Sequence, residues 1–257
     1  MPLDFISVDE AAARDGLRMA VVAGTPSPWG EGAKGIFRIK GLDWAAVKLV
    51  YDDPAFDTWA GQQSAPVLVY NDEKPRSGWA EILLLAERLA PEPALIPADP
   101  GERALMFGLA HELYGEGGLG WVRRLQLVHW TLTGADQPGF APPLADYIGG
   151  KYGYTPEAGA AADTRVHALL GLFADRLKAQ AAAGGEYLIG EAVTAVDVYA
   201  ATTMALFQPL PEAQCPMKPA TRAAFEALDA ATRAALDPVL LAHRDMMYDR
   251  HLGPVEL

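Results

Sequence analysis

The chain has 257 residues, of which 51% are hydrophobic and 21% charged, and it contains one cysteine. These values are typical of a globular protein of one or two domains, and they exclude a disordered chain, a collagen-like chain and a disulfide-stabilised scaffold. Aspartate and glutamate outnumber lysine and arginine by 33 to 21. Because no segment is basic enough to displace counterions from phosphates, we expect no nucleic acid as a partner.

Membrane insertion, secretion and metal binding are not expected either. The longest uncharged runs have fourteen residues, fewer than the roughly 20 that a transmembrane helix needs. Residues 1–15 lack the basic start and apolar stretch of a secretory signal, so a cytoplasmic location is expected. The single Cys215 and the scattered histidines offer no pair with metal-ligand spacing, so no metal site is predicted.

The first third of the chain has an α/β pattern, in which short apolar runs alternate with helix-like stretches. The predicted elements are a strand at Leu17–Ala23, a helix at Trp29–Gly41, strands at Ala45–Tyr51 and Pro66–Tyr70, and a helix at Trp79–Ala90. Four prolines between Pro91 and Pro100 then predict a linker, because proline interrupts both helices and central strands.

All of the longer elements predicted beyond the linker are helices. Asp99 and Pro100 are typical of a helix start. The predicted helices are 100–114, 121–132, 164–183, 194–207, 219–236 and 238–251, and a long Gly- and Pro-rich loop is expected over 134–156. The sequence therefore predicts an α/β domain over 1–92, with an N-terminal extension over 1–16, followed by an all-helical domain over 99–257.

A first candidate site lies where the first predicted strand meets the first predicted helix. Ser27 precedes Pro28, so its hydroxyl is a candidate helix cap. The same position offers free amides and a partial positive charge, which stabilise an anion such as a thiolate. Glycines follow at 30, 32 and 35 and weaken the helix, which close packing or a bound ligand would have to compensate. Both a structural cap and a ligand site remain open here.

Two further motifs complete the pattern. Pro66 opens an apolar strand, a position that suits a bend, a strand start or an edge. Thr194 and Asp197 have the spacing of a capping box, in which each side chain satisfies an amide at the start of a helix.

In this order and at these separations, the three segments resemble the glutathione transferase superfamily, with a bacterial, serine-type or omega-like active-site position. Residues 27–42 end in Lys40-Gly41-Leu42, similar to the family's Lys-Gly-Ile; Ala65-Pro66 matches its cis-proline; and residues 187–198 match its capping-box segment. The resemblance covers roughly residues 17–210. It implies a thioredoxin-like N-terminal domain and an all-helical C-terminal domain, with glutathione as co-substrate.

The resemblance also implies roles for individual residues. Ser27 stands where family members activate the glutathione thiol, with Thr25 and Trp29 as alternates. The resemblance places the cysteinyl part of glutathione against the backbone of Val67, after Pro66, and its glycyl carboxylate near Gln63.

One departure from the family pattern concerns the glutamyl end of glutathione. The family usually has an acid followed by a serine about twelve residues after the cis-proline, but this chain has Arg76, Ser77 and Gly78 there. The offset is ambiguous by one residue, so Ser77 stands either for the family serine or for its acid. In the first case Arg76 replaces the acid, and an arginine could favour a different anionic group.

A small electrophile is the expected second substrate, in a pocket between the domains. The candidate lining residues are Tyr114, Trp121, Arg123, Arg124 and His129, with a possible lid from Tyr147, Tyr152 and Tyr154. Helically spaced aromatics are more often core, and paired arginines more often a solvated face. The resemblance further implies a homodimer. The alternative function is a non-catalytic binding protein of the same fold.

Overall fold

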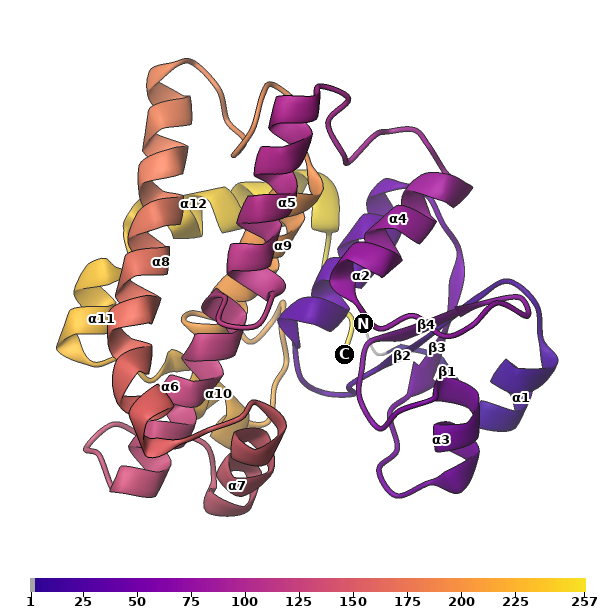
Figure 1. The fold of residues 1–257 in the computed structure, drawn as a ribbon, viewed down its shortest axis with the longest axis horizontal. Helices are drawn as coiled ribbons and strands as arrows, with labels where there is room; N and C mark the ends of the chain where they lie inside the picture. Colours follow the sequence, from indigo (N-terminus) through magenta and orange to yellow (C-terminus); the bar gives the residue numbers. More distant parts are fainter. Residues whose placement is uncertain (1–2) are drawn as a thin grey trace.

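The computed structural model describes residues 3–257 as two halves that lie side by side (Figure 1). The first half is a four-stranded sheet with helices on both faces. Its elements are β1 (Phe5–Ile6), α1 (Val8–Ala13), β2 (Leu17–Val21), α2 (Pro28–Ile39), β3 (Trp44–Lys48), α3 (Pro54–Ala60), β4 (Val67–Tyr70) and α4 (Trp79–Leu89).

The sheet has the strand order β1-β3-β2-β4, with β4 antiparallel to the three parallel strands. Successive side chains of a strand point to opposite faces. Leu68 therefore joins the core beneath α2 and α4, whereas Val67 joins a second core with Phe56 of α3. This is the thioredoxin-like arrangement predicted for the first domain.

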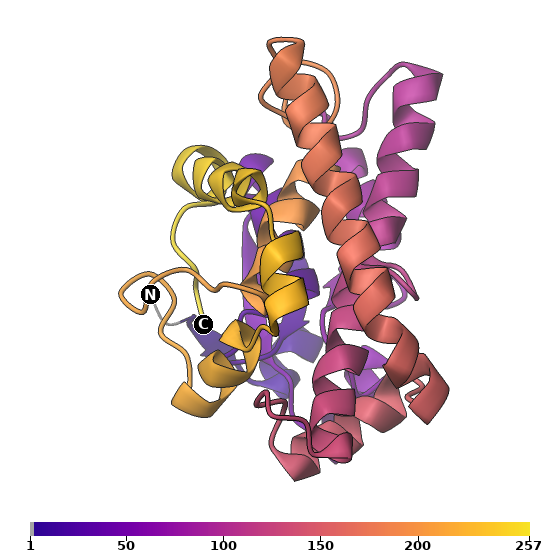
Figure 2. The same cartoon turned by 90° about the vertical axis from the view of Figure 1, so that its left-hand side faces the viewer.

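The second half is entirely helical, as predicted. Its elements are α5 (Pro100–Tyr114), α6 (Leu119–Thr133), α7 (Pro142–Lys151), α8 (Pro156–Ala182), α9 (Ala195–Thr203), η1 (Met204–Leu206), α10 (Pro219–Glu226), α11 (Ala230–Ala235), α12 (Pro238–Met247) and η2 (Tyr248–Leu252). Figure 2 shows α8 running the length of this half. The structure has no helix within residues 3–257 that is long and apolar enough to cross a membrane.

The predicted capping box at the start of α9 is confirmed. The Asp197 carboxylate accepts hydrogen bonds from the Thr194 amide at 2.9 Å and from its hydroxyl at 2.8 Å, and also from the Leu188 amide at 2.7 Å. His243 of α12 contacts the same carboxylate at 3.1 Å. Asp197 is fully buried. This one carboxylate therefore holds α9, the segment at Leu188 and α12 in their relative positions.

The glycines of α2 are explained by close packing between the two halves. A Cβ added at Gly32 would lie 2.5 Å from the Tyr114 hydroxyl, and one at Gly35 would lie 2.6 Å from a methyl group of Leu252 and 3.0 Å from one of Val198. Gly30 is different, because a Cβ there has its nearest neighbour at 3.9 Å, the Cβ of Ser27. At two of the three positions, packing against α5, α9 and η2 thus compensates for the low helix propensity of glycine.

Several predicted boundaries and one predicted loop are wrong. The 134–156 region contains helix α7, which begins at consecutive prolines that suit a first turn. The helix expected over 219–236 divides into α10 and α11, separated at 227–229 where Ala227 is extended. The first domain also contains the edge strand β1 and helices α1 and α3, none of which was predicted; β1 and α1 lie within the predicted N-terminal extension.

Candidate active site

The N-terminus of α2 follows directly after β2 and presents an unengaged serine. Ser27 occupies the N-cap position, with extended backbone, but its hydroxyl forms no capping hydrogen bond. The interpretation of this side chain as a structural cap is therefore wrong. Its carbonyl accepts the Glu31 amide at 2.8 Å. Pro28 has no amide, and the next amides, of Trp29 and Gly30, precede the first intrahelical donor, so the helix directs them outward. The hydroxyl and these amides are available to an anion.

The edge of the sheet beside this helix corrects the assignment of Val67. The Ala65-Pro66 peptide bond is cis. Leu68 exchanges both of its backbone hydrogen bonds with Arg76, at 2.8 Å each, on the outer side of β4. Neighbouring residues of a strand turn their amides and carbonyls to opposite sides. The backbone of Val67 consequently faces its register partner Ala20 in β2 and cannot pair with a ligand at the edge.

Ala65 is the residue that sequence reasoning missed at this edge. Within residues 3–257, neither its amide nor its carbonyl has a hydrogen-bond partner. It is partly exposed and immediately precedes the buried Pro66. A ligand strand could therefore pair with Ala65. The signal was present in the sequence, because Ala65 is the residue before the proline that begins the strand.

Three of the predicted site residues are brought together around one small cavity. Trp29, Pro66 and Ser77 line it together with Tyr114 and Tyr199. Its volume is about 10 Å³, close to what a single water molecule occupies. The cavity joins the starts of α2, β4 and α4, and a larger ligand would lie over it rather than inside it.

The side chains of Gln63 and Arg76 are engaged by neighbouring acids. Gln63 donates from Nε2 to Asp57 Oδ2 at 2.6 Å. Arg76 pairs with Glu73, which also accepts from Arg88 at 2.6 Å. Hydrogen bonds from Arg88 and Arg76 lower the pKa of the Glu73 carboxyl. The positive charge of Arg76 is thus already matched.

At the start of α4, Ser77 and Gly78 offer polar groups of a different kind. Ser77 is exposed. Gly78 is the N-cap residue of α4, and its amide donates to Glu81 Oε2 at 3.2 Å. The first-turn amides that follow in α4 point toward the same end of the sheet as those of α2.

Trp29 faces the helical half rather than the edge of the sheet. Its Nε1 donates to the Tyr114 carbonyl at 2.9 Å, and its ring lies 5.4 Å from the Tyr114 ring and 6.1 Å from the Tyr152 ring. Tyr114 is buried and bonds to the Pro28 carbonyl and, at 2.6 Å, to Thr202. The start of α2 is therefore fixed against the second half by direct contacts.

The other candidate lining residues do not all lie in one place. Arg124, Trp121 and Tyr152 lie near Trp29, with Arg124 4.5 Å above the Trp29 ring and Trp121 4.6 Å from Tyr152. Arg123 instead points into the helical core, where burial lowers its pKa to about 9. His129 and Tyr154 bond to one another at 3.0 Å.

The prediction that the paired arginines form a solvated face is wrong. Arg123 and Arg124 are both buried, at 0% and 6% exposure. Of the three residues predicted as a lid, two contact the first half: the Tyr147 ring lies 5.5 Å from that of Tyr51, and the Tyr152 ring lies 6.1 Å from that of Trp29. Helix α7 therefore bridges the two halves.

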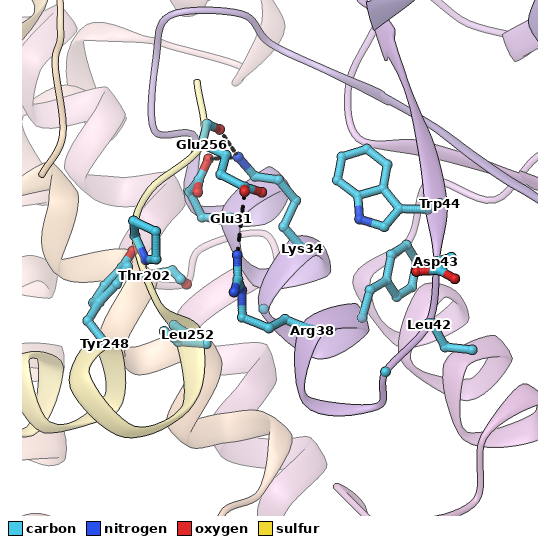
Figure 3. Close-up of a pocket in the computed structure, with 14 residues that line it drawn as sticks. Glu31, Lys34, Arg38, Leu42, Asp43, Trp44, Thr202, Tyr248, Leu252 and Glu256 are labelled. Carbon is cyan, nitrogen blue, oxygen red and sulfur yellow. Dashed lines mark hydrogen bonds and ion pairs between the residues drawn. The ribbon is translucent and has the colours of Figure 1, made fainter. Parts of the chain in front are cut away.

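A larger cavity, of about 330 Å³, lies on the opposite face of α2 (Figure 3). Its charged side chains pair with one another: Lys34 with Glu31 at 2.6 Å, and Arg38 with Glu256 at 3.5 Å. Lys34 also donates to the Glu256 carbonyl. Burial raises the pKa of Glu31. These contacts attach the C-terminal tail to α2 and engage the charged side chains of α2, whereas Asp43, which also lines the cavity, forms no ion pair with a side chain of residues 3–257.

The structure supplies no obvious metal centre. Across residues 3–257, no three His, Cys, Asp or Glu side chains converge in a way that could hold a metal ion. Cys215 is buried, and burial raises its thiol pKa to about 11.

The protein thus consists of a thioredoxin-like domain, in which the N-terminus of α2 is accessible, followed by an all-helical domain. Solved structures share this fold. No protein-family model and no curated protein sequence matches the chain. A glutathione S-transferase from Methylobacterium radiotolerans, solved with glutathione sulfonate, is 19% identical, with a TM-score of 0.60 over 94% of this chain and 96% of that one.

Two other solved structures agree. A glutathione transferase family member from Pseudomonas fluorescens with two glutathione bound is 12% identical, with a TM-score of 0.63 over 95% of each chain. A glutathione S-transferase from Methylobacillus flagellatus with glutathione bound is 14% identical, with a TM-score of 0.63 over 93% of this chain and 100% of that one. The chain therefore has the glutathione transferase fold.

Proposed function

We propose that the protein is a glutathione transferase that activates the glutathione thiol for attack on a small electrophile. The observation that carries this proposal is the free hydroxyl of Ser27 at the start of α2, next to outward amides and to the unpaired backbone of Ala65. The glutathione bound to solved proteins of the same fold supports the choice of co-substrate.

The tripeptide would lie along the outer edge of the sheet. Its cysteinyl part would pair with the amide and carbonyl of Ala65 in the manner of an added strand. Its γ-glutamyl carboxylate would bind Ser77 and the first-turn amides of α4, where the helix end favours negative charge. Gln63 would reach the glycyl carboxylate after leaving Asp57.

The thiol would rest against Ser27 and be ionised there. A hydrogen bond from a hydroxyl to a charged group contributes about 1.5–3 kcal/mol, and a helix N-terminus about 0.3–1 kcal/mol. Because one pKa unit corresponds to about 1.36 kcal/mol, these contributions lower the thiol pKa from ~8.5 by one to three units. A decrease of about two to three units makes the thiolate the main form at neutral pH. The thiolate attacks an electrophilic carbon, whose leaving group departs with the bonding electron pair, or a peroxide, whose O–O bond breaks to give an alcohol and a sulfenic acid.

A binding protein without turnover is the second candidate function. The pairing of Arg76 with Glu73 favours it, because Arg76 stands where family members have an acid for the glutamyl end, and its charge is already matched by Glu73. The two functions predict different behaviour of the same variant.

The experiment that separates them combines retention on immobilised glutathione with conjugation of a generic aryl halide. Under the enzyme proposal, the wild-type protein is retained and active, and Ser27→Ala is retained but loses conjugation. Thr25→Ala, which removes the alternate hydroxyl, keeps its activity. Retention without activity in the wild-type protein supports the binding protein instead, and absence of both rejects glutathione as the ligand.

We also propose a cytoplasmic homodimer. Leu84 on α4 and Leu105 on α5 are 45% and 38% exposed, and they lie on the helices that border the linker between the two halves. A second copy that covers these leucines would remove apolar surface from water. Size-exclusion chromatography with light scattering gives twice 27.5 kDa for the dimer, and a value of 27.5 kDa contradicts it.

A further inference from the structure

Arg124 is a buried cation without an anionic partner. It lies on α6, is 6% exposed, and donates one hydrogen bond from Nη1 to the Gly120 carbonyl at 3.0 Å. Its Nε and Nη2 have no acceptor within residues 3–257, and no carboxylate there pairs with it. Burial lowers its pKa. A buried charge in this situation is costly unless something pairs with it.

The neighbouring Arg123 shows what a satisfied buried arginine looks like in the same helix. Its guanidinium donates to the Leu206 carbonyl at 3.0 Å, and also to Gln126 and to the Ala227 carbonyl. Arg124 has no comparable set of hydrogen-bond acceptors among residues 3–257. The free nitrogens of Arg124 are not completely enclosed, unlike Arg18 Nε and Trp59 Nε1, which are unpaired and enclosed by protein atoms.

A second basic side chain reaches the same place from another helix. Lys151, at the end of α7, donates to the Ser64 hydroxyl at 2.7 Å and lies 6.0 Å from the centre of the Tyr152 ring. Arg124 lies 5.4 Å from the centre of that ring. Lys151 is exposed as a residue, and partial desolvation of its ammonium, followed by the positive charge of Arg124, lowers its pKa. No acidic side chain within residues 3–257 pairs with Lys151.

Two positive charges thus converge on one tyrosine in a protein whose net charge is -12. The place where they converge adjoins the proposed thiol site on both sides. Trp29, beneath Arg124, is two residues from Ser27, and Ser64, bonded to Lys151, directly precedes Ala65. The rings of Trp29 and Tyr152 supply flat apolar surfaces beside the charges.

We propose that the second substrate carries a carboxylate on an aromatic ring, and that Arg124 and Lys151 bind this carboxylate while Trp29 and Tyr152 contact the ring. This inference rests on the proposed function and names its substrate class. A carboxylate is the group that matches the two free nitrogens of a guanidinium, through parallel hydrogen bonds. The anion would supply the charge that Arg124 lacks, and it would hold the ring next to the thiol.

The test is equilibrium binding, measured by calorimetry in the absence of glutathione. The two probes are dinitrobenzoate and dinitrobenzamide, which are alike in size but differ in charge. The wild-type protein binds the benzoate at least about tenfold more tightly than the amide, the ratio expected when one charged hydrogen-bonded pair is gained. Lys151→Gln reduces this ratio, and Arg124→Gln abolishes it. The matched control Lys218→Gln, at an exposed lysine before α10, leaves it unchanged.

Three results overturn the proposal. Equal affinity of the wild-type protein for the two probes means that the basic pair does not recognise an anion. A preference that persists in both Arg124→Gln and Lys151→Gln means that other residues create it. Competition between the benzoate and saturating glutathione means that the pair belongs to a carboxylate of the tripeptide and not to a second substrate.

The binding experiment does not depend on turnover, so a failure of this inference can be distinguished from a failure of the proposed function. If glutathione neither binds nor is conjugated, the probe preference still reports on Arg124 and Lys151. Two controls distinguish loss of the anion site from loss of folding. Circular dichroism shows whether Arg124→Gln is folded. The conservative variant Arg124→Lys keeps the positive charge and therefore keeps part of the preference for the benzoate.

Discussion

Gly32→Ala tests the packing of α2 against the helical half in a way that separates tertiary contact from helix propensity. In an isolated helix this substitution stabilises by about 1 kcal/mol. Here the new Cβ would lie 2.5 Å from the Tyr114 hydroxyl oxygen and 3.0 and 3.1 Å from two ring carbons. The helix cannot move away freely, because Gly35 is already in close contact with Leu252 and Val198. Tyr114 must therefore leave its position.

The expected cost follows from what Tyr114 loses. Inserting a methyl group into a packed region costs about 1–3 kcal/mol. Displacing the hydroxyl breaks its hydrogen bonds to the Pro28 carbonyl and to Thr202, each contributing about 0.5–1.5 kcal/mol. After the gain in helix propensity, Gly32→Ala lowers the free energy of unfolding by about 1–5 kcal/mol.

Urea denaturation measures this change, and Gly30→Ala is the matched control. The control adds the same methyl group to the same helix, but its nearest contact is 3.9 Å away, so its free energy of unfolding rises by up to about 1 kcal/mol. In a Tyr114→Phe background, which lacks the closest atom, Gly32→Ala costs less than in the wild-type protein. If Gly32→Ala is as stable as the wild-type protein, the account of these glycines is refuted.

Two further predictions concern buried groups. Asp197→Ala leaves the Leu188 and Thr194 amides unpaired and lowers the free energy of unfolding by about 3–5 kcal/mol; urea denaturation measures this, and a loss below about 1 kcal/mol contradicts the role of the capping box. Burial raises the Cys215 thiol pKa to about 11, above its unfolded value, so the stabilisation it provides is complete below ~8.5 and is lost as pH rises toward 11. The free energy of unfolding of the wild-type protein therefore falls more steeply between these pH values than that of Cys215→Ala, and parallel curves contradict the raised pKa.

The elements that the sequence predicted best are those with a strong local signal. Periodic apolar residues located β2, α2 and α4 to within a few residues, and the Thr194 and Asp197 spacing located the start of α9. Helix α7 was hidden because its region is rich in glycine and proline, although two consecutive prolines mark its first turn.

The candidate site was predictable only in part, because its geometry depends on long-range contacts. Ser27 and Pro66 were found from their positions at the starts of elements, and Ser77 from the resemblance to the glutathione transferase family. The correction from Val67 to Ala65 required the bridge between Leu68 and Arg76, which sequence spacing does not reveal. Arg123 and Arg124 are adjacent in the sequence but point to different surroundings, and the acceptors of Arg123 include carbonyls 83 and 104 residues away.

The proposed function is tested most directly by the pKa of the glutathione thiol in its complex with the protein. Ultraviolet absorbance of the thiolate, titrated with saturating glutathione, gives this pKa for the wild-type protein and for Ser27→Ala. The account predicts a value near neutrality in the wild-type protein and a value at least about one unit higher in Ser27→Ala, because the hydroxyl donates to the thiolate. The same thiol pKa in both proteins, with glutathione bound to both, would contradict the role of Ser27.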